Sequence, residues 1–468
     1  MASARHPRRS TGPHREKNHR ISANGTRDAT LPRHRQDIEH GTSGTKRRRR
    51  RGPKIRVEGE SGRRGLHPLH FFRIIWRSTC FLSRAVNILW PIVPIAIAVY
   101  YRVEGHDTAK FTLAYIAMVP CANLIGFAGQ ELARKMPHML GVLTETTIGS
   151  IVEIVLFMIL LANRLYPVIQ AAILGSILAT MLLCLGMCFF ASGIRREDAH
   201  FDEAITEAGS GLLLTAGVAL AVPTIYEYSL APLVERGELA WTTEQLDGEV
   251  LHISRAVAIL LLIGYATFIF FQTRTHHGLF TAIFEHDEAR DHDREKDEAK
   301  DKLTLTECIV ALVISVGLVT IIAYILVNEI EPLVEHNGIS DPFMGLILVP
   351  LVEKAAEHLT AVDEAWDNQM NFALSHCVGA TLQTAMLNGP LVVLVGWIMN
   401  RPMSFNFEIF DMVMLVLAII TVGNFLRDQK TNYLEGVLCV LVYVAIATAA
   451  FFYPSLHVAS AEGSGGEH

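Results

Sequence analysis

The sequence lacks the signatures of a disulfide-stabilised, secreted or hydrolytic protein. Its seven cysteines are scattered, mostly inside apolar stretches, and show neither a disulfide framework nor a metal-thiolate spacing. No apolar stretch precedes residue 70, so we expect no secretory signal peptide. Neither His-Glu-x-x-His nor Gly-x-Ser-x-Gly occurs, which disfavours a membrane-embedded hydrolase. We therefore expect a protein that is not an enzyme.

Long apolar runs are what the sequence has in abundance. Half of the residues are hydrophobic, and several runs reach the ~20 residues that cross a hydrocarbon core about 30 Å thick. This pattern predicts an all-α, polytopic membrane protein with about eleven transmembrane helices. The least distinct of the predicted spans is 111–128, because CANLIGFAGQ becomes polar toward its end. The spans are 85–101, 111–128, 141–162, 167–191, 208–226, 255–271, 305–327, 343–362, 372–399, 409–426 and 434–452.

The first sixty-odd residues have a different composition. They are rich in Arg, His, Gly and Ser, carry the run KRRRRR at 46–51, and are expected to be disordered. Such a run is found in nuclear-import signals and nucleic-acid patches. Before a membrane domain, however, it favours a cytosolic N-terminus that contacts anionic membrane lipid. We expect no nucleic-acid partner and a regulatory role for this tail.

An acidic loop follows the sixth predicted span. With the N-terminus cytosolic, residues 285–302 return to the cytosol, and we favour a solvated linker over a cation-attracting or regulatory loop. Five spans on either side would enter the membrane in opposite orientations, as in an inverted repeat. The expected organisation is a disordered basic tail (1–68), an N-terminal helix region (69–104), a first membrane repeat (105–276), the acidic cytosolic loop (277–302), a second membrane repeat (303–455) and a short tail (456–468).

Four carboxylates lie inside two of the predicted membrane spans. Glu145 and Glu153 lie in GVLTETTIGSIVEIVLFMILL, and Glu353 and Glu357 lie in GLILVPLVEKAAEHLTAV. An ionised side chain near the middle of a bilayer costs at least ~2.5 kcal/mol, so it rarely occurs there without a function. Two such segments in two halves of one chain predict a cation transporter built from a repeat.

The first segment has the composition of a cation site. Glu145, Gly149 and Glu153 are spaced by four, so a continuous helix would present them on one face. Gly149 has no side chain, which permits close approach of another helix. Thr147 and Ser150 add hydroxyl oxygens to the carboxylates, and hard cations such as Ca²⁺ prefer oxygen ligands.

The second segment repeats this composition. Pro350 loosens the helix, and Glu353 and Glu357 are again four residues apart. One interpretation is that Lys354 pairs with Glu357 or Glu353 and only neutralises the bundle interior. The interpretation we favour is that Glu357 alternates between a proton and a metal ion, while Glu353, Lys354 and His358 tune it.

The span after each carboxylate segment is also polar. The first contains Gln170, Ser176 and Thr180, and the second contains Gly379 and Gln383. Small and amide residues in membrane helices often only pack and hydrogen-bond between helices. Their matching positions in the two halves favour the walls of an ion site.

Several segments resemble the cation/proton exchangers of the Ca²⁺/cation antiporter superfamily, in particular the fungal vacuolar Ca²⁺/H⁺ exchangers. The resemblance spans roughly residues 70–455. It implies ten core helices in two inverted five-helix repeats, an extra N-terminal helix, and Glu153 and Glu357 as the central metal ligands. It is carried by VIQAAILGSILATMLLCLGMCFFASG (168–193), SRAVAILLLIGYATFIFFQTRTH (254–276), AAEHLTAV (355–362) and DQKTNYLEGVLCVLVYV (428–444).

The chain departs from the two motifs of that family. These motifs are Gly-Asn-Ala-Thr-Glu and Gly-Asn-Ala-Ala-Glu-His, and here Ser150 and Lys354 replace both asparagines. Glu353 replaces the glycine of the second motif, and Thr180 stands where a further asparagine is expected. A lysine ammonium offers no acceptor and repels a metal ion, so these departures bear on which cation is bound.

The resemblance implies a secondary-active Ca²⁺/H⁺ antiporter in the vacuolar membrane. A monovalent Na⁺ or K⁺/H⁺ antiporter of the same fold and a non-transporting ion sensor are the alternatives. We expect no cofactor besides the transported cation and protons, with membrane lipid and other copies of the chain as partners. Glu153 and Glu357 would bind metal, and the wider site would comprise Gly149, Ser150, Thr147, His358, Glu353, Ser176 and Gln383, tuned by Lys354, Glu145, Gln170 and Thr180.

Overall fold

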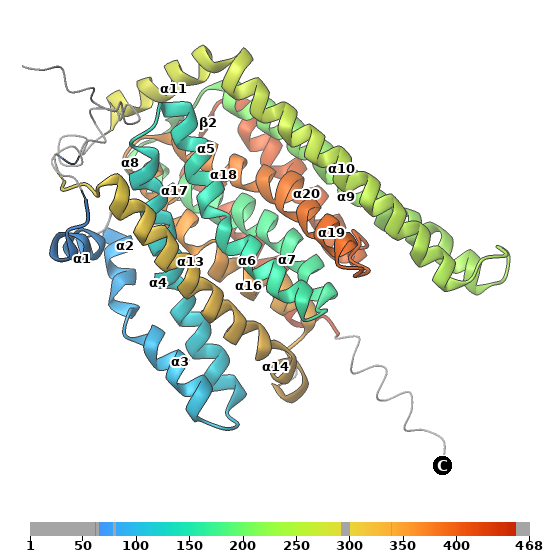
Figure 1. The fold of residues 1–468 in the computed structure, drawn as a ribbon. Coiled ribbons are helices and arrows are strands. Elements are labelled where there is room, and N and C mark those ends of the chain that lie inside the picture. The colour runs from blue at the N-terminus through green and yellow to red at the C-terminus, as the bar shows by residue number, and fades with distance from the viewer. Residues whose placement is uncertain (1–60, 62–64, 78–80, 292–299, 338, 455–468) are drawn as a thin grey trace, which may run out of the picture. The chain divides into compact units, whose positions relative to one another are not determined.

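The computed structural model of this chain is almost entirely helical (Figure 1). The expected basic tail and the short C-terminal tail fall almost wholly outside the residues that the structure describes. Those residues are 61, 65–77, 81–291, 300–337 and 339–454.

The first half of the chain builds five helical spans after an N-terminal region. That region contains a short amphipathic helix with buried Phe71 and Ile74, then the first span. Two of the later spans change helix type or break partway. The elements are α1 (Pro68–Arg77), α2 (Phe81–Val86), η2 (Asn87–Leu89), α3 (Ile92–Arg102), α4 (Asp107–Ala133), α5 (His138–Gly149), α6 (Ile151–Ala162), α7 (Tyr166–Leu178), η3 (Ala179–Cys184), α8 (Leu185–Arg195), α9 (Glu203–Glu235), α10 (Thr243–Phe270) and η4 (Phe271–Thr275).

The second half begins with a helix outside the spans and then repeats the pattern. The hydroxyl of Thr304 accepts the N–H of Glu307, whose carboxylate accepts the N–H of Thr304, so a capping box starts the first of its spans. The elements are α11 (His277–Arg290), α13 (Leu305–Asn328), α14 (Ile330–Asn337), α15 (Asp341–Phe343), η5 (Met344–Leu348), α16 (Val349–Glu353), α17 (Ala355–Trp366), α18 (Met370–Gln383), η6 (Thr384–Asn388), α19 (Gly389–Ile398), α20 (Ile409–Phe425), η7 (Leu426–Asp428) and α21 (Tyr433–Phe451).

Ten helices in the described part of the chain are long and apolar enough to cross a membrane. They correspond to ten of the eleven predicted spans, and the least distinct prediction, 111–128, lies inside the unbroken helix α4. The eleventh, 343–362, exists as a series of short helices from α15 to α17. Charged residues and a helix break interrupt it, so it does not reach the length and hydropathy of a regular span. The predicted all-α polytopic fold is confirmed.

The two broken spans run in opposite directions. In Figure 1, α5 lies toward the end of the bundle that carries α11 and continues into α6 at the other end. In the other broken span, α16 contacts α6, and α17 continues toward the α11 end. The N-terminal half of one span therefore lies at the same end as the C-terminal half of the other, which is the arrangement of an inverted pair. The two most buried spans are Tyr166–Arg195 and Met370–Ile398.

A two-stranded antiparallel pairing joins the two halves outside the helices. Strand β1 (Ala199–His200) pairs with β2 (Lys430–Thr431), with Ala199 opposite Thr431. It fixes the link that follows α8 against the link that precedes α21.

Helix α11 corrects the expectation of a solvated linker after the sixth span. Phe280, Ile283, Phe284 and Asp287 of this helix are buried. The Asp287 carboxylate accepts hydrogen bonds from the backbone N–H of Asn371 (2.7 Å) and from its side-chain amide (2.9 Å). The acidic segment therefore begins with a docked helix whose carboxylate binds the N-terminus of α18, where a negative charge is favourable. The rest of the predicted acidic loop lies partly outside the described residues.

We expect Asp287→Ala to release α11 from α18. Hydrogen bonds to a charged acceptor contribute about 1.5–3 kcal/mol each, so their loss should increase amide exchange in α11 at least about tenfold. Hydrogen exchange on the purified protein measures this. Glu285→Ala, on the exposed side of the same helix, is the matched control. Equal exchange in the two variants would contradict the anchoring role of Asp287.

Acidification is not expected to release this helix. Burial raises the pKa of Asp287 above its ordinary value of 3.8, although the hydrogen bonds from Asn371 and Phe372 oppose the shift. The folded chain thus binds this proton more tightly than the unfolded chain does. Docking is strongest below the ordinary pKa and declines as the pH rises through the raised pKa. Opening of α11 in mildly acidic buffer, corrected for intrinsic exchange, should be no faster than at neutral pH.

Candidate functional site

In each of the two broken spans, the helix is interrupted about one turn before a glutamate. Ser150 (φ −72°, ψ −3°) separates α5 from α6, and Lys354 (φ −91°, ψ −1°) separates α16 from α17. Glu153 and Glu357 are then the third residues of α6 and α17. A half-helix N-terminus carries partial positive charge and unpaired N–H groups, which stabilise a carboxylate in its first turn. Ser150 and Lys354, which replace the two asparagines of the family motifs, are thus the residues at which the two helices break.

Lys354 lies between the two carboxylates. Its Nζ is 2.7 Å from Glu153 Oε2 and 3.2 Å from Glu357 Oε2, and its side chain is only 1% exposed. The lysine therefore crosses to the glutamate of the other half as well as pairing within its own helix. The sequence-based alternative named Glu357 or Glu353 as its partner, and only the pairing with Glu357 is present. Removing one member of such a buried pair is costly because it leaves a charge without compensation.

Glu153 has further donors that the sequence analysis missed. The Thr384 hydroxyl lies 2.8 and 2.9 Å from the two carboxylate oxygens, and the Asn388 amide donates to Oε2 at 2.8 Å. Both donors come from η6, in the second half of the chain. In the sequence, only the spacing of four between Thr384 and Asn388 within QTAMLNGP could have indicated that they act together.

Glu353 and the neighbouring polar side chains form the rest of the wall. Ser176 donates a short hydrogen bond to Glu353 Oε1, while Glu353 Oε2 has no hydrogen-bond partner. The Thr180 hydroxyl and both polar atoms of the Gln383 amide are also buried without a hydrogen-bond partner. Buried polar atoms of this kind are costly unless a ligand or water satisfies them. Of the predicted wall residues, Ser176 contacts Glu353, and Thr180 lines a cavity with Glu357.

Gly149 is in contact with the second glutamate, as its lack of a side chain suggested. A Cβ added at this position would lie 2.5 Å from Glu357 Oε1. Only glycine leaves room for the carboxylate at the break between α5 and α6.

We expect Gly149→Ala to reduce transport by about tenfold or more, because it displaces Glu357 and a small misplacement of a reacting group is costly. Vesicle uptake driven by a pH gradient measures the effect. Gly379→Ala is the matched control in α18, since a Cβ there would meet only Thr146 Cγ2, at 3.8 Å. Comparable uptake by both variants would show that the close approach at Gly149 is unimportant.

A cavity of about 30 Å³ extends from Glu357 away from Lys354. His358, named by the sequence analysis, is on its wall, and its Nε2 is buried without a hydrogen-bond partner. This volume is large enough for about one water molecule. The lining includes Glu145, Gly149, Thr180, Glu357, His358 and His376.

His376 joins two carboxylates at the far side of this cavity. Its Nδ1 is 2.7 Å from Glu364 Oε2, and its Nε2 is 3.6 Å from Glu145 Oε2. The side chains of Glu145 and Glu364 are 20% and 16% exposed, similar to that of Glu357 (17%), whereas Glu153 is 1% exposed. Glu145 and Glu153, expected on one face of a continuous helix, lie in two helices that the break at Ser150 separates. Glu145 instead belongs to a second polar group, with His376 and Glu364.

Three other predicted site residues have different surroundings from those expected. Thr147 is exposed and donates to Leu143 O within its own helix, so Thr146, not Thr147, lines the cavity. Ser150 donates to Thr147 O and acts through the helix break. Gln170 donates to the Ser404 carbonyl (3.0 Å), which ties α7 to the segment before α20. That contact is structural.

The chain matches the sodium/calcium exchanger protein family over residues 106–274 and 308–452. It is 31% identical to a vacuolar calcium ion transporter of Schizosaccharomyces pombe, over 80% of this chain and 86% of that protein. It is 30% identical to vacuolar cation/proton exchanger 2 of Arabidopsis thaliana, over 80% and 82%. It is also 31% identical to a Ca²⁺/H⁺ antiporter of Aphanothece halophytica, over 77% and 95%.

Solved structures share the fold. Native YfkE superposes with a TM-score of 0.64 at 23% identity, covering 79% of this chain and all of that one. An H⁺/Ca²⁺ exchanger, CAX, gives a TM-score of 0.54 at 13% identity, covering 82% and 94%. At these identities the likeness concerns the architecture alone.

Proposed function

Because the chain belongs to the sodium/calcium exchanger protein family, we propose that it is a secondary-active Ca²⁺/H⁺ antiporter of the vacuolar membrane. The fungal, plant and cyanobacterial relatives named above carry calcium-transport or cation/proton-exchange names and match most of the chain. The ten apolar helices fit a multi-pass membrane protein. The site consists of carboxylates, hydroxyls, amides, imidazoles and one ammonium, groups that can bind cations and protons.

The observation that carries the proposal is the pair of glutamates joined by Lys354 at the meeting point of two broken helices. The site contains three carboxylates, Glu153, Glu353 and Glu357, and two of them pair with the ammonium of Lys354. If all three are ionised, the group has an excess of negative charge. A cation or protons can neutralise that excess, but one carboxylate oxygen cannot hold both at once. This competition is the basis of exchange.

Lys354 acts as a tethered cation within the site. A Ca²⁺ ion ligated by Glu153 and Glu357 would need the place that Nζ now takes between them. The positive charges repel by about 4 kcal/mol per unit charge at ~4 Å and an effective dielectric near 20, so a divalent ion is repelled twice as strongly. The lysine therefore moves aside when the cation binds and returns when it leaves. Since it lies at the α16–α17 break, this movement couples ion binding to the hinge of the span.

The cavity between Glu357 and the Glu145–His376–Glu364 group supplies the route to one side of the membrane. It lies toward the α11 end of the bundle, which corresponds to the cytosol if the N-terminus is cytosolic. Cations approaching from that end first meet the two partly exposed glutamates. His376 lies between them and, when protonated, offsets part of their charge.

A monovalent-cation/H⁺ antiporter is the second candidate, and Lys354 is the observation that favours it. A Na⁺ or K⁺ ion suffers half the repulsion of a divalent ion from the same ammonium. Three carboxylates favour binding of Ca²⁺ over binding of a monovalent ion. The charge of the lysine reduces this difference in affinity.

Uptake of ⁴⁵Ca²⁺ and ²²Na⁺ into sealed vesicles with an acidic interior separates these functions. We expect Ca²⁺ uptake that disappears when the pH gradient is collapsed. Proton-dependent Na⁺ uptake without Ca²⁺ uptake would establish the second candidate. Absence of both, or a proton-independent current, would contradict antiport altogether.

A further inference from the structure

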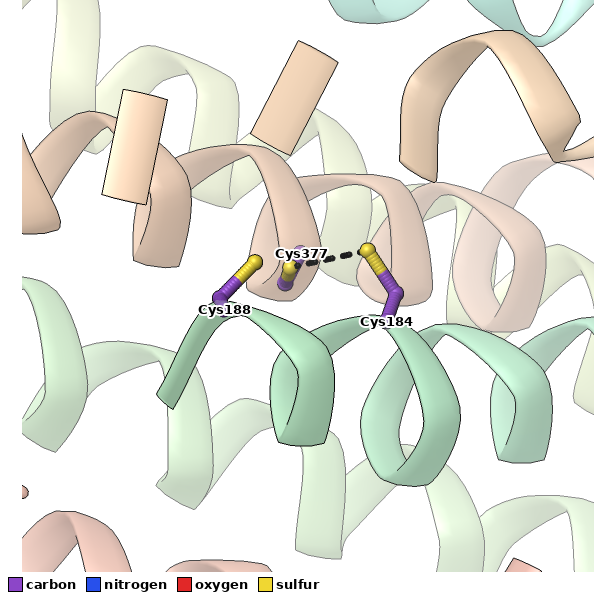
Figure 2. Close-up of side chains that lie close together, drawn as sticks. All are labelled: Cys184, Cys188 and Cys377. Carbon is purple, nitrogen blue, oxygen red and sulfur yellow. Dashed lines mark hydrogen bonds between the residues drawn. The ribbon is translucent and has the colours of Figure 1, made fainter. Parts of the chain in front are cut away.

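Three cysteines lie together beside the ion route (Figure 2). Cys184 and Cys188 are one turn apart, at the end of η3 and in α8, and Cys377 comes from α18. The Sγ atoms of Cys184 and Cys377 are 3.6 Å apart, and all three sulfurs lie within 4.8 Å of one another. Their spacing of four places Cys184 and Cys188 on one helix face. The fold adds the third thiol from nearly two hundred residues away.

The thiols have the spacing of metal ligands. A tetrahedral thiolate site with Zn–S bonds of about 2.3 Å holds its sulfurs about 3.8 Å apart. Within the residues that the structure describes, this is the only group of three His, Cys, Asp or Glu side chains with ligand atoms so close together. The cysteines at positions 121, 308 and 439 are buried but outside this group.

The thiols are also accessible to a small ion. All three are at most 3% exposed, yet Cys184 and Cys377 line the cavity of about 30 Å³ that runs from Glu357 to His376. A metal ion in that cavity would meet two sulfurs directly, with Cys188 behind them. The cavity also leaves room for a fourth ligand, such as a water molecule.

We propose that Cys184, Cys188 and Cys377 form a binding site for a thiophilic divalent cation such as Zn²⁺ or Cd²⁺. Three soft sulfur ligands select such ions over Ca²⁺, which prefers oxygen. Each thiol releases its proton to water as its sulfur binds the metal, so a divalent ion held by three thiolates leaves one net negative charge. The bound metal would link α8, from the first half of the chain, to α18, from the second. The proposal concerns binding and does not depend on the transport function.

Cd²⁺ is the probe, added to the purified full-length protein under reducing conditions. We expect one tightly bound Cd²⁺ per chain, with sulfur-to-metal charge-transfer absorption in the ultraviolet, and a higher unfolding temperature on binding. Cys377→Ser should abolish the absorption and reduce Cd²⁺ affinity at least about a hundredfold, since removing a ligand costs more than the 10–100-fold loss caused by mutating a second-shell partner. Cys439→Ser, which removes a buried cysteine outside the group, should behave like the unmodified protein.

Folding of each variant is checked by its unfolding temperature without metal. If Cys377→Ser does not fold, Cys188→Ser serves in its place, because Cys188 is not on the cavity wall. Three results would overturn the proposal. They are the absence of a charge-transfer band in the unmodified protein, a band that persists in Cys377→Ser or in Cys188→Ser, and a band that is lost equally in Cys439→Ser.

Discussion

Glu153→Gln and Glu357→Gln are each expected to reduce proton-driven Ca²⁺ uptake by about a hundredfold or more. Glutamine has nearly the same shape but cannot ionise, so it neither carries the exchanged proton nor supplies the charge that draws a cation into the bilayer. In Glu153→Gln, Thr384 and Asn388 can still hydrogen-bond the side chain, and Lys354 keeps Glu357 as a partner. The loss therefore reflects the charge and not the shape.

Uptake into vesicles with an imposed pH gradient measures this loss. Glu329→Gln is the matched control, since Glu329 is also buried and ion-paired, with Lys110 (3.7 Å), but lies outside the site. It should retain most of the uptake. Proton-dependent uptake above about a tenth of the original in either site variant would contradict a central role for that carboxylate.

Lys354→Asn is expected to increase Ca²⁺ affinity by about tenfold or more. The substitution removes a positive charge 2.7 Å from Glu153 and 3.2 Å from Glu357, and the asparagine adds an amide oxygen that binds Ca²⁺. Even a small part of the ~4 kcal/mol repulsion per unit charge exceeds the 1.4 kcal/mol that corresponds to a factor of ten. The Ca²⁺ concentration for half-maximal uptake measures the affinity.

The same variant should make folding depend on Ca²⁺. Without the ammonium, three buried carboxylates face one another, which should cost about 3–5 kcal/mol in the absence of the ion. We expect a lower unfolding temperature than for the unmodified protein without Ca²⁺, and a much larger rise when Ca²⁺ is added. Lys354→Arg, which keeps the charge, should show neither effect. An unchanged Ca²⁺ response in Lys354→Asn would show that the ammonium does not compete with the cation.

The sequence alone was sufficient for the membrane spans and for the choice of carboxylates. The transfer free energy of apolar residues and the cost of a buried charge depend on the residues of a single segment. Ten spans and the four intramembrane glutamates could therefore be found without any knowledge of packing. The helix breaks, including the one that divides the eleventh span, were harder to predict from the sequence. Ser150 and Lys354 end a helix only where neighbouring helices satisfy the freed backbone groups.

The tertiary structure alone decided which of these charges meet. Thr384 and Asn388 lie 231 and 235 positions from Glu153, and Asp287 lies 84 positions from Asn371. Cys377 likewise reaches Cys184 across 193 positions. No local periodicity encodes such pairs, because they arise from the crossing of two oppositely oriented halves. The sequence by itself determined that this membrane protein buries carboxylates in both halves. Only the packing of those halves placed Lys354 between Glu153 and Glu357, since an ammonium buried away from water is stable only where acidic partners converge on it.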